Sequence, residues 1–220
     1  MEVKAHEPDP DWTAMFGQYT KDVSKEKLQS WWSRILAGEI ISPGQTSIRT
    51  LGVLRDMTQQ DAERFQALTN YVINQNFIFY SSDFRNRFPI SYFVQYSDFQ
   101  HLSECRLIIF SSTSTFDIIW SDVTQSSLSY GHSNHLLIER MQGSEGRIST
   151  PAQRLTTAGK ELYQVSNPKT HEGYLRDLST FLRSKNCKLH LLKNSQVLPG
   201  GKIKYAKKIP IETTVNFECG

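Results

Sequence analysis

The chain has 220 residues and the composition of an ordinary globular protein. Hydrophobic residues make up 38% and charged residues 21%, which excludes a disordered or fibrous chain. No run approaches the roughly 18 apolar residues that a membrane helix needs, and the first 11 residues are charged and broken by prolines where a signal peptide would be apolar. We therefore expect a cytoplasmic protein that does not associate with membranes.

Cysteine and histidine spacing gives no metal or disulfide signature. Cys105, Cys187 and Cys219 stand far apart with no C-x-x-C pair, so the sequence predicts reduced thiols rather than a disulfide framework or a zinc cluster. His132 and His135 are three residues apart in a predicted turn, and no third ligand follows at a usable spacing. No metal and no cofactor are expected.

Basic residues are concentrated in the second half of the chain. Residues 1–110 carry 11 basic and 13 acidic side chains, whereas residues 111–220 carry 14 basic and nine acidic ones. The stretch 183–208 has eight basic residues and no acidic one. Such a stretch can neutralise phosphates and release their counterions, which makes nucleic acid a candidate partner. The alternative is a solvated edge strand, whose lysines prevent edge-to-edge aggregation.

Apolar periodicity predicts a compact helical unit in the first third of the chain. Asp11 is a candidate N-cap for the first helix and Ser24 for the second, whose apolar residues form one broad stripe. Thr58 and Asp61 have the spacing of a capping box at the start of the fourth helix. The four helices are predicted over residues 12–23, 24–40, 47–57 and 58–74.

The remainder of the chain alternates between strand and helix patterns, which predicts an α+β fold. Helices are predicted over 97–102, within 155–162 after a threonine cap, and over 174–182, and strands over 77–80, 107–110, 116–120, 136–138, 187–192 and 202–211. The last strand is expected to return beside 187–192 as a hairpin. The expected organisation is a helical unit (1–75), a winged-helix-like α+β unit (76–165) and a C-terminal helix with a basic β-hairpin (166–220).

Two resemblances accompany this pattern. Helix, helix, strand and hairpin, followed by a helix opened by Leu-Thr-x-x-Gly at Leu155 to Gly159, is similar to a winged-helix module. A longer block resembles a bacterial family of unknown function, whose members also share Asp-x-Asp-Trp, here Asp9 to Trp12. The block comprises Trp32-Ser33-Arg34-Ile35-Leu36-Ala37-Gly38-Glu39-Ile40, Pro43-Gly44, Ser47 and Arg49-Thr50-Leu51. This resemblance covers roughly residues 9–165 and implies a segment before the Asp-Trp element, where family members usually carry further sequence.

Most residues of this block have a structural explanation. Trp32 belongs to the apolar stripe, and Pro43-Gly44 makes a turn. The charged residues left are Arg34, Glu39 and Arg49, which could form a buried ion pair that fixes the angle between two helices or could bind an anionic ligand. We favour the ion pair, because no phosphate-cradling glycine loop accompanies these residues.

No catalytic motif is present, so we expect a protein without enzymatic activity. The preferred hypothesis is a protein-interaction or regulatory module of a bacterial stress or phage-defence machine, which binds a protein partner or a second copy through an aromatic segment. That segment contains Tyr92, Phe93, Tyr96 and Phe99.

The alternative hypothesis is a winged-helix protein that binds nucleic acid mainly through phosphate contacts. Its candidate contact residues are Arg85, Arg87, Arg140, Arg147, Lys202, Lys204, Lys207 and Lys208. The candidate recognition helix, residues 91–102, carries no Arg or Lys, which argues against reading of the major groove. The interaction hypothesis is preferred for this reason.

Overall fold

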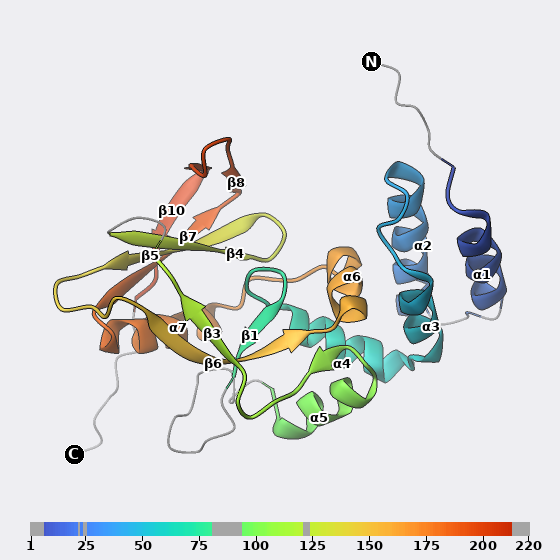
Figure 1. Ribbon diagram of the computed structural model, residues 1–220, viewed down its shortest axis with the longest axis horizontal. Helices are drawn as coiled ribbons and strands as arrows, with labels where there is room; N and C mark the ends of the chain where they lie inside the picture. Colours follow the sequence, from blue (N-terminus) through green and yellow to red (C-terminus); the bar gives the residue numbers. More distant parts are fainter. Residues whose placement is uncertain (1–6, 22, 24–25, 81–93, 121–123, 213–220) are drawn as a thin grey trace. The chain divides into compact units, whose positions relative to one another are not determined.

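The computed structural model describes residues 7–21, 23, 26–80, 94–120 and 124–212 (Figure 1). Within them the chain forms α-helices and antiparallel β-strands, so the predicted α+β class is confirmed. None of the helices in these ranges is both long and apolar enough to cross a bilayer.

The chain divides into two compact units, each made of three separate segments. Unit 1 comprises residues 1–69, 97–110 and 155–167, and unit 2 comprises residues 70–96, 111–154 and 168–220. The predicted three-part division itself stays a prediction, as does the winged-helix arrangement, part of which falls on residues 81–93, outside the described ranges.

Unit 1 is built mainly from helices. They are α1 (Pro10–Thr20), α2 (Glu26–Ile41), α3 (Ile48–Asp56), α4 (Gln59–Thr69), α5 (Tyr96–Glu104) and α6 (Thr157–Val165), with the short strand β2 (Ile108–Ile109) after α5. The fourth helix is shorter than predicted, because Ile73 forms a β-bridge with Phe77 instead of continuing the helix. α1 contacts α3, and α2 contacts both α4 and α6.

Side-chain caps fix where these helices begin. The carboxylate of Asp9, not the predicted Asp11, accepts the N–H of Trp12, because Pro10 takes the first helical position of α1. The Thr58–Asp61 capping box is confirmed: each side chain bonds the backbone N–H of the other residue. Thr156 caps α6 as predicted, while Ser24 lies outside the described residues.

Aromatic and aliphatic side chains fill the core of unit 1. Trp31 of α2 meets Phe65 of α4 edge to face, with ring centroids 6.0 Å apart. Gly159 of α6 lies against the carbonyl of Leu107, where a Cβ atom would come within 2.0 Å of the oxygen. Only glycine allows this close approach, which gives the Leu-Thr-x-x-Gly block a structural reason.

The described part of unit 2 contains the longer β-strands and the helix α7. Its elements are β1 (Phe77–Phe79), β3 (Thr115–Ile118), β4 (Gln125–Tyr130), β5 (Asn134–Arg140), β6 (Ile148–Leu155), α7 (Glu172–Ser184), β7 (Cys187–Lys193), β8 (Gln196–Val197), β9 (Ile203–Lys204) and β10 (Lys207–Pro210). β1 and β3 pair with β6. A second sheet has the order β10-β7-β5-β4. The predicted pairing of the last strand beside residues 187–192 is confirmed for residues 207–210, whereas residues 203–204 form the separate strand β9, which pairs with β8.

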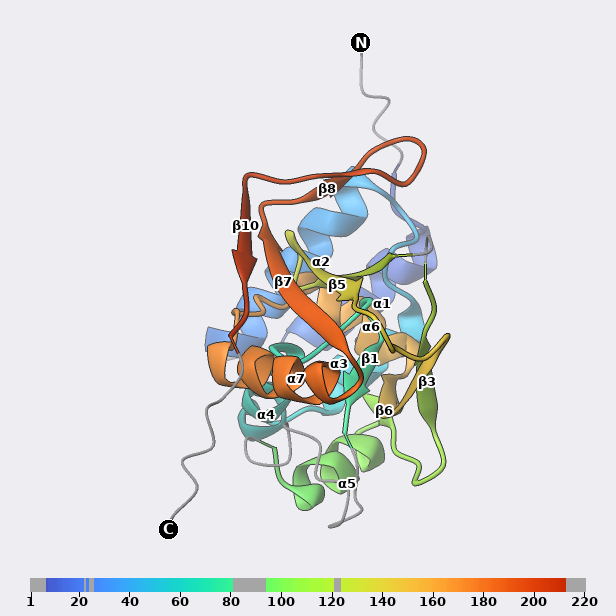
Figure 2. The same cartoon turned by 90° about the vertical axis from the view of Figure 1, so that its left-hand side faces the viewer.

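The two faces of this second sheet differ. Leu136 and Ile138 of β5 face the same side as Leu191 and Leu189 of β7, and all four are buried. α7 lies against β7 (Figure 2) and buries its own apolar stripe. The opposite face, called here the open sheet face, carries alternate residues of the same strands, many of them polar and partly exposed.

Candidate functional site

The block from Trp32 to Leu51 that resembles the family, called here the signature block, contains the turn between α2 and α3 in unit 1. Glu39 is buried, and its carboxylate accepts the N–H of Gly44 at 2.5 Å and that of Thr46 at 3.3 Å. Trp12 donates its indole N–H to the carbonyl of Thr46 at 2.7 Å. Gly44 has a φ of +86°, a conformation that glycine adopts without strain. The turn that follows Pro43 is therefore held mainly by side-chain bonds to its backbone.

The predicted ion pair of this block is not formed. Arg34 donates to the carbonyl of Val165 at 2.8 Å, and Arg49 is exposed. The described residues contain no ion pair between Glu39 and either arginine, because the backbone N–H groups already occupy the carboxylate. Trp32 is buried and packs against Phe16 at 5.4 Å, as the apolar stripe predicts. These residues therefore shape the interior of unit 1.

The arginines proposed for phosphate binding are engaged within unit 2 where they are described. Arg140 donates to the hydroxyl and the carbonyl of Ser144, and its guanidinium lies 5.1 Å from the ring centroid of Trp120. Arg147 is 3.5 Å from the carboxylate of Asp117. Arg85 and Arg87 lie outside the described residues.

The four lysines proposed to contact nucleic acid, Lys202, Lys204, Lys207 and Lys208, do not all share one surface. Lys207 and Lys208 are neighbours on β10, so their side chains point to opposite faces of the sheet. Lys202 flanks the small β8–β9 hairpin and Lys204 belongs to it. Lys208 donates to Glu139 at 2.7 Å, and this bond, more than the loss of hydration that opposes it, keeps the pKa of Glu139 below its usual value.

A groove of about 700 Å³ in unit 2 lies between the open sheet face and residues 200–208, which include the second strand of the β8–β9 hairpin. Lys202, Lys208 and Tyr205 line one part of it, and Ser127 and Glu139 line another. The groove is lined by one carboxylate and two ammonium groups, so its net positive charge is smaller than the eight basic residues of 183–208 suggest. The groove is a weaker phosphate site than eight clustered basic residues would be.

The aromatic segment is not a continuous exposed surface. Phe99 is fully buried in α5, where it stacks on Phe110 with centroids 5.6 Å apart. Tyr96 is 49% exposed. Tyr92 and Phe93 lie outside the described residues. Phe99 therefore serves the core of unit 1, and Tyr96 alone of the described pair is accessible to a partner.

The structure shows an exposed apolar surface on α2 that was not predicted. Leu36 and Ile40 belong to the broad apolar stripe expected to face the core, but both are exposed, together with Ile41. The last turns of α2 present Ser33, Leu36, Ala37, Ile40 and Ile41 to solvent, and these five residues are called here the α2 outer face. Their spacing of three and four residues puts them on one side of the helix. The apolar stripe is wider than one packing partner covers, and periodicity alone does not show which edge stays exposed.

Three chemically distinct side chains of unit 1 converge between α4 and α5. Asp61 is buried at the first turn of α4, and its Oδ1 lies 2.5 Å from Nε2 of His101. The same Nε2 is 3.7 Å from Sγ of Cys105, the residue that follows the last residue of α5. Oδ2 of Asp61 accepts both the N–H and the hydroxyl of Thr58. We call Asp61, His101 and Cys105 the ligand triad.

The ligand triad is not arranged as a nucleophilic relay. Such a relay uses both ring nitrogens of the histidine, one for the nucleophile and one for the carboxylate. Here Asp61 and Cys105 approach the same nitrogen of His101. Burial also raises the pKa of the Cys105 thiol, which disfavours the reactive thiolate.

The local helix geometry fixes this arrangement. His101 and Cys105 are four residues apart, so they lie on one face of the helical segment. Arg106 follows with a φ of +60°, and this left-handed residue lets Leu107 donate to the carbonyl of Leu102 and end the helix. Arg64 and Asp98 approach to 4.0 Å and form a second contact between α4 and α5.

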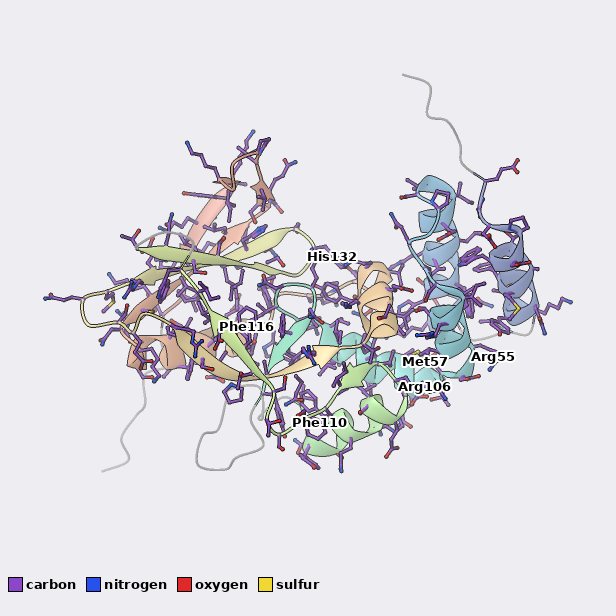
Figure 3. The ribbon with its side chains drawn as sticks, in the orientation of Figure 1. Arg55, Met57, Arg106, Phe110, Phe116 and His132 are labelled. Atoms are coloured by element: carbon purple, nitrogen blue, oxygen red, sulfur yellow. The ribbon has the colours of Figure 1, made fainter. Side chains whose placement is uncertain are left out.

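A cavity of about 300 Å³ adjoins the ligand triad at Cys105. Val53, Asp56, Met57, Glu104 and Arg106 form the rest of its lining. Met57 and Arg106 are labelled close together in Figure 3. Cys105 is thus shared by the cavity and the triad.

The two histidines first considered as metal ligands do not join such a cluster. His132 lies in the turn between β4 and β5 (Figure 3), and Nδ1 of His135 is 2.9 Å from the hydroxyl of Ser195. In the part of the chain that the structure describes, the one group of three candidate ligands is the ligand triad. Sequence spacing could suggest only its His101–Cys105 half, because Asp61 lies 40 residues away from His101.

Comparisons with curated proteins and with solved structures find no match to this chain. A family profile described as "Protein of unknown function (DUF2806)" matches residues 1–179. This match includes the signature block and the ligand triad. The chain therefore belongs to this family of unknown function.

Proposed function

We propose that this chain is a protein-interaction module that binds another protein through the α2 outer face. The observation that carries the proposal is the exposure of aliphatic side chains there: Ile40 is 54% and Ile41 is 79% exposed. Exposed apolar groups that gather on one surface are typical of interaction sites. The partner would belong to the bacterial stress or phage-defence machinery that the sequence-based hypothesis named.

The chemistry of the α2 outer face suits a helix of the partner. None of its five residues is charged, although 21% of the chain is. The hydroxyl of Ser33 already donates to the carbonyl of Gln29 at 2.8 Å, so its burial would leave no donor unpaired. Ser33 and Ala37 are small and flanked by larger aliphatic residues, which allows close packing of a second helix. Depletion of charge is also a mark of interface cores.

A second copy of the chain is the first partner to test, because purified protein suffices. Sedimentation equilibrium of the full chain should give a molar mass that rises with concentration, and Ile40→Glu should abolish the rise. Val197→Glu is the matched control, since Val197 is also 54% exposed but lies in unit 2. An equal effect of both substitutions would contradict self-association through α2.

A different protein partner is tested by photo-crosslinking in the host cell. A crosslinking amino acid at position 41 should capture a discrete protein, whereas the same amino acid at position 119 should not. Ile119 is a suitable control because it is 69% exposed and lies in unit 2. A monomer in solution with no product specific to position 41 would refute the proposal.

The alternative function, nucleic-acid binding, has one observation in its favour. Lys202 and Lys204, at the β8–β9 hairpin of unit 2, and Lys207, on β10, are exposed. Binding to mixed-sequence duplex DNA should then fall steeply with salt and weaken when these lysines and Lys208 are replaced together by Gln. Lys160→Gln with Lys169→Gln serves as a control on other exposed lysines. Failure to bind at low salt would exclude this alternative.

A further inference from the structure

We infer that Asp61, His101 and Cys105 form a binding site for one transition-metal ion of the zinc type. A carboxylate oxygen, an imidazole nitrogen and a thiolate sulfur are the donors that Zn²⁺ uses in proteins. The three atoms lie within 4.8 Å of one another. This inference is independent of the proposed interaction through α2.

One separation within the triad is close to that of a tetrahedral site, and a second would have to lengthen. With Zn–N and Zn–S bonds of about 2.0 and 2.3 Å, two ligand atoms in a tetrahedral site stand roughly 3.5 Å apart. The observed separation of His101 Nε2 and Cys105 Sγ is 3.7 Å. Asp61 Oδ1 and His101 Nε2 share a hydrogen bond at 2.5 Å, so the metal would replace the proton and separate them by about 0.8 Å more.

The partners around Asp61 favour a ligand role. Thr58 binds Oδ2 through its N–H and its hydroxyl, which orients the carboxylate and directs Oδ1 toward His101. A hydrogen-bonded ligand carboxylate of this kind is common in metal sites, where outer partners orient the ligands. Two anionic ligands would also balance the charge of a divalent ion.

The cavity beside Cys105 distinguishes this site from a closed structural one. Structural zinc ions have four protein ligands, whereas an ion with three keeps a position for water or another small ligand. The triad supplies three donors, and Cys105 lines a cavity of about 300 Å³. The fourth position would therefore be open to this cavity, which Arg106, Asp56 and Glu104 surround with charge.

Titration of the metal-free full chain with Co²⁺ tests the site directly. Cobalt in a tetrahedral site absorbs in the visible range, and a thiolate ligand adds a charge-transfer band in the near ultraviolet. We expect one equivalent of Co²⁺ to produce both bands and Zn²⁺ to displace it. Cys105→Ser should remove the charge-transfer band, and His101→Gln and Asp61→Asn should weaken binding at least roughly tenfold.

Controls separate this site from other thiols and from misfolding. Cys187→Ser and Cys219→Ser should leave the charge-transfer band unchanged, and circular dichroism should show that each variant is folded. Zinc should also slow alkylation of Cys105 in the unsubstituted chain, which mass spectrometry reads without any substitution. No cobalt band in the unsubstituted chain, a band that survives Cys105→Ser, or alkylation of Cys105 unaffected by zinc would overturn the inference.

Discussion

Two buried carboxylates of unit 1 have opposite surroundings. Both oxygens of Glu39 accept backbone N–H groups of the turn between α2 and α3. Asp61 commits only Oδ2 to the backbone and side chain of Thr58, and its Oδ1 faces His101 and the nearby Cys105. A carboxylate fully used by the backbone can only hold structure. One with an oxygen turned toward a histidine and a thiol can also bind a ligand.

The largest effect on stability is expected at the first of these two carboxylates, Glu39. Glu39→Ala should lower the unfolding free energy of unit 1 by about 3 kcal/mol, because two charge-assisted hydrogen bonds are lost and the N–H groups of Gly44 and Thr46 are left unpaired. Glu26→Ala, at an exposed position of the same helix, should change it by less than about 0.5 kcal/mol.

Denaturant unfolding that reports on unit 1 alone measures this difference. Trp12, Trp31 and Trp32 belong to unit 1, whereas Trp120 belongs to unit 2. Tryptophan fluorescence in a Trp120→Phe background therefore follows unit 1 only, which avoids treating two units as one transition. Equal stabilities of Glu39→Ala and Glu26→Ala would show that the turn does not depend on Glu39.

Substitutions of Asp61 should lower the stability of unit 1 by less, and Ala and Asn should differ in their effects. Asp61→Ala removes the capping box and should cost about 1–2 kcal/mol. Asp61→Asn keeps an oxygen acceptor for Thr58, so it should cost less than half as much while it impairs metal binding. The same fluorescence assay compares both variants. If Asn were as destabilising as Ala, the negative charge rather than the cap would hold the start of α4.

A smaller effect concerns the turn itself. Gly44→Ala forces a residue with a Cβ atom into a φ of +86°, which should cost about 1 kcal/mol although no neighbour lies within 4 Å of the new atom. Gly52→Ala is the control, since Gly52 lies inside α3 with a similarly open environment, and there Ala should stabilise the helix. Loss of stability in both variants would point to crowding rather than backbone strain.

The contacts of Glu39 and Asp61 also show which interactions could be predicted from the sequence and which could not. The Thr58–Asp61 and Thr156–Gly159 contacts were predictable, because a cap acts between residues three positions apart. The helices α2 and α3 followed from periodicity in the same way. The partner of Glu39 was predicted wrongly as an arginine, because a buried acid suggests an ion pair unless the turn beside it is known.

Contacts between segments far apart in the sequence could not be predicted. His101 meets Asp61 only because α5 packs beside α4, and nothing in the spacing of the two residues indicates it. For the basic stretch 183–208, the sequence instead suggested a common surface that the fold does not form. Consecutive lysines in the sequence imply one charged surface, but strand alternation sends Lys207 and Lys208 to opposite faces, and Glu139 compensates one of them.

The smallest expected effect is the pH dependence of the Asp61 region. Burial acts to raise the pKa of Asp61, but hydrogen bonds from His101 and Thr58 outweigh it and leave the pKa below the usual value. A lowered folded-state pKa means that Asp61 stabilises unit 1 above its unfolded-state pKa of about 3.9 and that this contribution is lost as the pH falls through the folded-state value.

The stability difference between the unsubstituted chain and Asp61→Asn should therefore be present at neutral pH and should shrink as the pH falls below about 4. Denaturant midpoints of unit 1 in the Trp120→Phe background measure it, with Glu63→Gln as an exposed control on the same helix. A difference that grows toward acid would mean that the folded state raises the pKa of Asp61. The carboxylate would then hold its proton more tightly, and the hydrogen bonds from Thr58 and His101 would not be what keeps it charged.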